Sequence, residues 1–258
     1  MKRLRFLSAC LVVVLVVSAV VAVSASAQAP EYGRCEKAPK IGKVYSGEFT
    51  NSGCTTKSET KTGKYEWHPG VVKKFQTSTG GKAVLEEVGK YSVGCETESS
   101  TGEYVGTKEV ANVRVRFKGC KVTPFICTTV GLKEGELETV PLEGRVVWEK
   151  EKEHKAALDL YPSDGMEKFI EFTCGASLTV AVRGSILVNV PVDKMSETVT
   201  LKYKGKHGFQ GLEYFEEGGV KVKDILEADF AGKGYDQADQ IITSTVKSEE
   251  KLELNAYV

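Results

Sequence analysis

The sequence predicts an all-β protein, an antiparallel β-sandwich or barrel with short helical pieces at most. Two observations carry this prediction: apolar and polar residues alternate in many short runs, and Gly, Pro and Asp clusters separate the runs. Alternation with a period of two is the pattern of a strand with one dry and one wet face. Short strands at regular spacing between turn residues are typical of sandwiches and barrels.

The clearest predicted strand runs from Val113 to Lys118, where three apolar residues alternate with three basic ones. The same alternation predicts further strands at 83–88, 145–149, 156–161, 170–174, 178–183, 198–204, 241–246 and 251–258. A helix is expected only around Gly234 to Gln240. We interpret the charged run Glu149 to His154 as the solvated end of a hairpin, and Gly205 to Gly219 as a long connection.

Residues 1 to 27 are predicted to be a secretory signal peptide. Three basic residues near the N-terminus precede an uncharged apolar run from Phe6 to Val23, and the small residues Ala25 to Ala27 form a cleavage site. The apolar run is also long enough for an uncleaved anchor, and the segment ending at Cys10 imitates a lipobox. We favour cleavage after Ala27. In each case the main domain leaves the cytoplasm, and the expected location is secreted or on the extracellular face of the cell envelope.

The exported chain, residues 28 to 258, is interpreted as a single disulfide-stapled β domain. A division into two packed subdomains near 127–141 is the alternative. This part holds 32 basic and 35 acidic residues, so its net charge of −3 gives no electrostatic footprint for nucleic acid or for an anionic membrane. No membrane insertion is expected after cleavage.

The even number of cysteines in an exported chain predicts three disulfides. We expect Cys120 to pair with Cys127 across a short turn that contains Pro124, and Cys35 to pair with Cys54. This leaves Cys95 with Cys174. A zinc site is disfavoured because no two of these cysteines have the close spacing of zinc ligands.

Several segments resemble a family of paralogous secreted bacterial proteins. They are Thr101 to Lys108, Val113 to Cys120, Cys127, Pro141 to Gly144, the opening Cys35 and Cys54, and Leu226 to Ala228 near the end. The similarity covers most of the exported chain. It implies secretion and the cysteine pattern, and because the family is uncharacterised it implies no activity, ligand or catalytic residue.

The sequence contains no nucleophile elbow, zinc-protease motif, phosphate loop or EF-hand spacing. With the cysteines paired there is no candidate thiol nucleophile. The three histidines are far apart in sequence and are interpreted as surface or loop residues: His68, His154 and His207. We therefore predict no catalytic residue, no metal site and no cofactor.

Carboxylates could still serve a hydrolase, because glycoside cleavage needs only two of them across a cleft. Glu171 and Asp159 stand between apolar neighbours, but each falls on the outward phase of its strand, where a solvated carboxylate is expected. Asp236 and Asp239 are too few for a calcium site, and we interpret them as the solvated face of a short helical turn.

Aromatic side chains favour a binding role. Trp148 is expected in the core, whereas Trp67 and His68, in a segment that ends with a Pro-Gly turn, are the candidate ligand contacts at an exposed loop. The sequence therefore predicts a non-catalytic binding or structural module of the cell envelope or extracellular space. The alternative is a secreted, carboxylate-dependent hydrolase that acts on glycans. The ligand or envelope partner and the oligomeric state stay open.

Overall fold

The computed structural model describes residues 30–256 except 90 and 164, so the predicted signal peptide and Cys10 lie outside the described residues. The described chain is all-β, which confirms the predicted class, and it contains one 3₁₀ turn, η1 (Glu151–Glu153). The strands are β1 (Glu31–Lys37), β2 (Lys40–Ile41), β3 (Val44–Tyr45), β4 (Tyr65–Pro69), β5 (Val71–Thr79), β6 (Ala83–Glu87), β7 (Ser92–Cys95), β8 (Thr97–Gly106), β9 (Glu109–Lys118), β10 (Lys121–Val122), β11 (Phe125–Thr128), β12 (Leu137–Glu138), β13 (Leu142–Lys150), β14 (Lys155–Pro162), β15 (Lys168–Cys174), β16 (Leu178–Gly184), β17 (Ile186–Val190), β18 (Ser196–Tyr203), β19 (Gly205–Lys206), β20 (Phe209–Gln210), β21 (Tyr214–Glu217), β22 (Val220–Lys223), β23 (Leu226–Phe230) and β24 (Asp236–Asn255).

One part of the molecule is a closed antiparallel barrel of eight strands. Its ladders run in the order β6, β7, β10, β11, β15, β16, β23 and the first residues of β24, which pair back onto β6. Three consecutive members are short, because β7 and β11 have four residues each and β10 has two. The ring of ladders is closed and has no unpaired edge. Of the two predicted architectures, sandwich and barrel, this part of the molecule is therefore a barrel.

A second, curled sheet continues from the barrel. Its ladders run from β17 through β14, β13, β9, β8, β5 and β24 to β18. The alternation predicted for the segment from Val113 to Lys118 lies within β9, and the charged run after β13 is the end of the β13–β14 hairpin, as expected. The segment expected to be a long connection, Gly205 to Gly219, instead contains the β19–β20 hairpin and the whole of β21.

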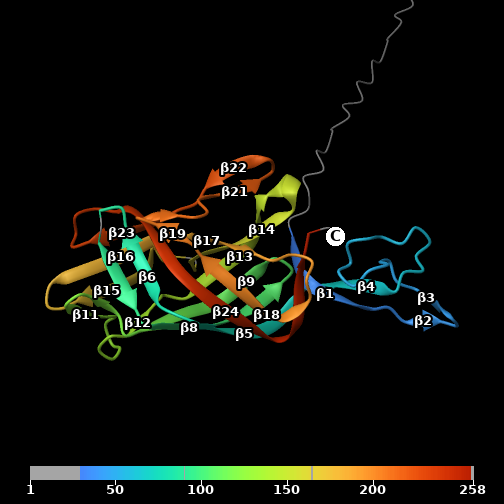
Figure 1. Cartoon of the computed structure of the whole chain (residues 1–258), viewed down its shortest axis with the longest axis horizontal. Coiled ribbons are helices and arrows are strands. Elements are labelled where there is room, and N and C mark those ends of the chain that lie inside the picture. Colours follow the sequence, from blue (N-terminus) through green and yellow to red (C-terminus); the bar gives the residue numbers. More distant parts are fainter. Residues whose placement is uncertain (1–29, 90, 164, 257–258) are drawn as a thin grey trace, which may run out of the picture.

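Strand β24 joins the two parts, as Figure 1 shows in red. Its first residues pair with β6 and β23 in the barrel, and its middle pairs with β5 and β18 in the curled sheet. The helix expected from Gly234 to Gln240 is therefore wrong. Ladder partners on both sides of Ala238, namely Leu226 and Glu87, hold this segment extended, because tertiary pairing outweighs local propensity.

The core follows the same division. One cluster of buried apolar side chains fills the curled sheet and includes Leu142 and Val246, whereas another fills the barrel and includes Phe172 and Phe230. Trp148 is buried, which confirms its predicted place in the core. On the outer face of β13, β14 and β17, a smaller cluster packs beneath the β21–β22 hairpin.

The N-terminal segment extends beyond the sheets. Strand β1 pairs with the end of β24 and with β4, and the β2–β3 hairpin projects from that end of the molecule (Figure 1). A small core formed by Phe49, Trp67 and the Cys35–Cys54 disulfide holds the segment together. Trp67 lies within β4 and is buried, so its expected exposure at a loop is wrong.

The disulfide Cys35–Cys54 agrees with the predicted pairing, but the other two predicted pairs are wrong. The bonds observed are Cys95–Cys120 and Cys127–Cys174. Cys127 does lie beside Cys120 in the β10–β11 hairpin, where its N–H donates to the Cys120 carbonyl at 2.9 Å. The observed partners face each other across the neighbouring ladders, with Cα separations of 4.0 and 3.9 Å, and side chains in such closely spaced pairs are nearer to each other than in a hydrogen-bonded pair. Cys120 therefore bonds to Cys95 on β7, and Cys127 bonds to Cys174 on β15.

Candidate ligand-binding cavity

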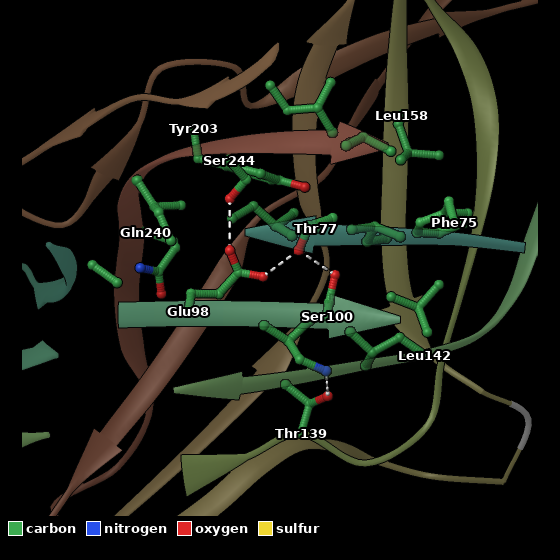
Figure 2. Close-up of a pocket in the computed structure, with 18 of the residues that line it drawn as sticks. Phe75, Thr77, Glu98, Ser100, Thr139, Leu142, Leu158, Tyr203, Gln240 and Ser244 are labelled. Carbon is green, nitrogen blue, oxygen red and sulfur yellow. Dashed lines mark hydrogen bonds between the residues drawn. The ribbon is translucent and has the colours of Figure 1, made fainter. Parts of the chain in front are cut away.

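A cavity of about 160 Å³ lies inside the molecule and draws its walls from both cores. The walls are mostly apolar and include Phe75, Leu85, Val113, Leu142, Phe172 and Ile242. Figure 2 shows that polar side chains, among them Thr77, Glu98 and Ser244, point toward one another inside these walls. Since native interiors leave few voids larger than a water molecule, a cavity of this size is a candidate binding site.

The polar group is centred on Glu98. Thr77 Oγ1 donates to Glu98 Oε1 at 2.7 Å, and Ser244 Oγ donates to Glu98 Oε2 at 2.9 Å (Figure 2). Thr77 Oγ1 also lies 2.6 Å from Ser100 Oγ. Because Thr77 has one hydroxyl proton and gives it to Glu98, Ser100 is the donor in that contact. Three hydroxyl groups are thus ordered toward one buried carboxyl group.

Strand alternation places these polar side chains inside. In β8, Glu98, Ser100 and Tyr104 share the buried phase, and in β24 Ser244 shares it with Val246. Sequence reasoning did not find this site, because the run from Thr97 to Thr101 is polar on both faces and carries no hydrophobic alternation. The available signal was the phase set by Tyr104 further along the same strand.

Burial dominates the electrostatics of the site. Removal from water raises the pKa of Glu98 above its ordinary value, and the hydrogen bonds from Thr77, Ser244 and Ser100 oppose that rise. Tyr203 lines the same cavity, and burial together with the Glu98 charge raises the pKa of its phenol far above the usual range. The phenol of Tyr203 is therefore a neutral group.

The cavity reaches the surface at the segment between β17 and β18. Pro191 and Lys194 line it and are exposed, and Ser196 follows them at the start of β18. Glu253 lines the cavity on the same side. Burial and the neighbouring Asp193 charge raise the pKa of Glu253 to about 7, with a hydrogen bond from Asn255 acting against this rise. A ligand can therefore enter past a rim that carries charged groups and reach an apolar interior.

Chemically, the site offers a large apolar surface and one fixed acceptor. A carboxylate has about four acceptor positions, of which Thr77 and Ser244 occupy two. The remaining positions suit a ligand that donates a hydrogen bond. A ligand carboxylate at the same place would meet the Glu98 charge in a low-dielectric environment, where repulsion is strong.

A second acidic group lies on the outer face of the curled sheet. Asp159 was expected to be solvated, but it is buried, with 4% of its surface exposed, so that expectation is wrong. It lies beside Asp224 and accepts a hydrogen bond from Arg145 Nε at 3.3 Å. The return of Asp224 after the β21–β22 hairpin covers this part of β14, which local alternation could not reveal.

Asp159 and Asp224 form a proton-sharing pair. Burial and the Asp159 carboxyl group raise the pKa of Asp224 to about 8, because two adjacent buried carboxyl groups resist ionising together. Glycosidases instead hold two carboxyl groups about 5 to 10 Å apart across an open cleft. Neither Asp159 nor Asp224 lines the apolar cavity or the polar hollow of about 830 Å³ beside the β21–β22 hairpin.

The candidate contacts Trp67 and His68 are neighbours on β4 and point to opposite faces. Trp67 packs in the small N-terminal core, and His68 is half exposed and lies 4.0 Å from Glu36. Neither lines the cavity or the polar hollow. Glu171 is exposed, as expected, whereas Asp239 is fully buried in β24 and not on a solvated helical turn.

Among the residues that the structure describes, no group of three or more His, Cys, Asp or Glu side chains could hold a metal ion. Within the same residues, no helix has the length and apolar character needed to span a membrane.

The fold and cavity define an all-β protein with a closed eight-stranded barrel, three disulfides and an interior site. Comparison of the chain with models of protein families, with curated proteins and with solved structures finds no match.

Proposed function

We propose that this chain is an exported, non-catalytic binding protein whose interior cavity takes a small apolar molecule carrying a hydrogen-bond donor. The observation that carries the proposal is the buried Glu98 carboxyl group, fixed by Thr77 and Ser244 inside otherwise apolar walls. Export is supported by the basic and apolar N-terminal sequence and by three disulfides, which persist in oxidising compartments.

Burying a charged or polar group costs free energy, because the group loses its contacts with water. The fold alone gives no reason to bear this cost at position 98, so the arrangement supports a binding role for Glu98. An apolar side chain at position 98 would line the cavity without that cost. A ligand donor would compensate part of the desolvation of Glu98, and the ligand's hydrocarbon would contribute about 25 cal/mol for each Å² it buries.

The volume limits the size of the ligand. An engineered protein cavity of about 150 Å³ lined by Leu, Ile and Phe binds benzene, and the cavity here is of about the same volume, 160 Å³. The expected ligand is thus a small ring or a short alkyl chain with one hydroxyl or amino group. A larger ligand would have to extend past Pro191 and Lys194 at the rim.

Isothermal titration calorimetry with hexan-1-ol, hexan-1-amine and hexanoate at one ionic strength tests the proposal. The alcohol and the amine are expected to bind, and the carboxylate to bind at least tenfold more weakly, because it places a second negative charge against Glu98. A Glu98→Gln variant is expected to lose at least half of this discrimination, since the amide carries no charge. A Glu171→Gln variant makes the same chemical change at an exposed position and serves as the matched control.

Equal affinity for all three ligands, or discrimination that persists unchanged in Glu98→Gln, would refute the proposed recognition by Glu98. A failure of all three ligands to bind to the folded protein would refute the cavity as a binding site for this class of molecule.

A further inference from the structure

The β2–β3 hairpin exposes two aliphatic side chains at the end of the molecule. In this hairpin Ile41 pairs with Val44, so both side chains lie on one face. Ile41 is 77% exposed and Val44 is 53% exposed. Gly42 at the tip has φ +65°, a left-handed conformation that glycine adopts without strain. Figure 1 shows that the hairpin projects away from both sheets.

Lysines surround this aliphatic pair. Residues 37–47 contain Lys37, Lys40 and Lys43 and no Asp or Glu, and all three lysines are exposed. The longer segment 37–64 contains six lysines and two glutamates. The segment therefore has a net charge of +4 within an exported chain whose net charge is −3. The near-neutral total conceals a strongly basic end.

We propose that the β2–β3 hairpin docks this protein peripherally on an anionic lipid bilayer. Ile41 and Val44 would enter the boundary between headgroups and acyl chains, and Lys37, Lys40 and Lys43 would lie among the phosphates. Apolar side chains flanked by lysines are the usual composition of segments that lie in a membrane interface. The docking does not depend on a ligand in the interior cavity.

Charge and size favour a bilayer over a protein partner. A specific protein interface buries at least about 1,000 Å² in total, whereas β2 and β3 have two residues each and offer one aliphatic pair. A bilayer needs no complementary shape. Each lysine close to an anionic surface contributes about fivefold to the partition coefficient.

Sedimentation of the exported chain with large vesicles tests the proposal, with pure phosphatidylcholine compared with phosphatidylcholine containing 30% phosphatidylglycerol. We expect binding to the anionic vesicles that weakens as salt rises from 50 to 500 mM, and at least tenfold weaker binding to the neutral vesicles. The variant Lys40→Glu/Lys43→Glu should bind at least 25-fold more weakly. The variant Ile41→Asp/Val44→Asp should also lose most of its binding.

Two matched controls keep the charge changes equal. Val130→Asp/Val220→Asp introduces the same two charges at exposed aliphatic positions in other loops and strands, and Lys221→Glu/Lys223→Glu reverses two exposed lysines on β22. Both controls should bind within about threefold of the unchanged protein. All positions are exposed, and a melting curve for each variant confirms the fold.

Three results would overturn the proposal. They are the absence of binding to anionic vesicles, a loss in the controls as large as in the hairpin variants, and vesicle-independent self-association that the Ile41→Asp/Val44→Asp variant abolishes. The last result would instead assign the hairpin to contacts between copies of this chain.

Discussion

Removal of the Cys127–Cys174 disulfide should destabilise the protein strongly. The bond closes a loop of 47 residues, and in the chain-entropy model a loop of this length contributes about 4 kcal/mol to the free energy of unfolding. It also joins β11 to β15, where the ladder of the closed barrel has two residue pairs. The structure therefore predicts that the double variant Cys127→Ala/Cys174→Ala loses about 4 kcal/mol and that the barrel becomes the first part to open.

Equilibrium unfolding in guanidinium chloride, followed by tryptophan fluorescence and far-UV circular dichroism, measures this loss. The matched comparison is Cys35→Ala/Cys54→Ala, which opens a loop of 19 residues at the N-terminal segment. Chain entropy assigns about 3 kcal/mol to that bond. Because Cys35–Cys54 lies outside both sheets, its loss should release the N-terminal segment before the barrel. Hydrogen exchange locates the opened region in each variant.

A loss below about 1 kcal/mol for Cys127→Ala/Cys174→Ala, or faster exchange confined to the N-terminal segment in that variant, would show that this disulfide does not hold the barrel closed. Peptide mapping without reduction checks the premise: peptides joining Cys127 to Cys174 and Cys95 to Cys120 are expected. A peptide in which Cys120 is bonded to Cys127 would contradict the observed arrangement.

Three further predictions concern the buried polar groups and the core. Because the pKa of Asp224 is raised to about 8 in the folded protein from 3.8, the folded state binds this proton more tightly, and stability should fall as pH rises from about 4 to 8, by up to about 1.4 kcal/mol per pH unit for one proton. Asp224→Asn should flatten this slope in thermal melts between pH 5 and 8, and an unchanged slope would count against the pair. Thr77→Val leaves Glu98 and Ser100 without their shared partner and should cost about 1 to 3 kcal/mol in denaturant unfolding; a neutral result would mean that the two hydrogen bonds of Thr77 do not stabilise the fold. Leu142→Ala should cost about 3 to 5 kcal/mol and enlarge the cavity, so that ligands longer than hexan-1-ol bind relatively better, whereas an unchanged size preference would mean that Leu142 does not bound the ligand.

The class of the fold was predictable because alternation is a local property. The side chains from Val113 to Phe117 announce their strand directly, and the charged run after β13 is readable as a hairpin end. The helix expected at Gly234 to Gln240 failed for the opposite reason. That segment contains no strand pattern of its own, and its pairing with β6 and β23 depends on residues distant in the sequence.

The disulfides illustrate the same limit. Cys120 and Cys127 are near in sequence and adjacent in the hairpin, yet the register of β10 and β11 makes them a hydrogen-bonded pair. Their sulfur partners come from neighbouring strands, and Cys174 lies 47 residues away from Cys127. Which strand flanks each side of the hairpin is set by the closure of the barrel and is not encoded in the cysteine spacing.

The candidate site was not predictable, since its members are ordinary in sequence. Thr77, Glu98 and Ser244 lie on three strands and read as polar residues of exposed strand faces. They converge only because β5 pairs with both β8 and β24. Asp159 is similar, because its burial comes from the chain around Asp224, which returns over β14 long after that strand has ended.

A crystal structure of the protein with hexan-1-amine would show whether the interior cavity binds an apolar molecule through a donor to Glu98. We expect density for the alkyl chain along Phe75, Leu142 and Ile242, with the amino nitrogen within about 3.2 Å of a Glu98 carboxylate oxygen. An empty cavity in crystals grown at a saturating amine concentration, or an amine bound with its nitrogen away from Glu98, would contradict this expectation.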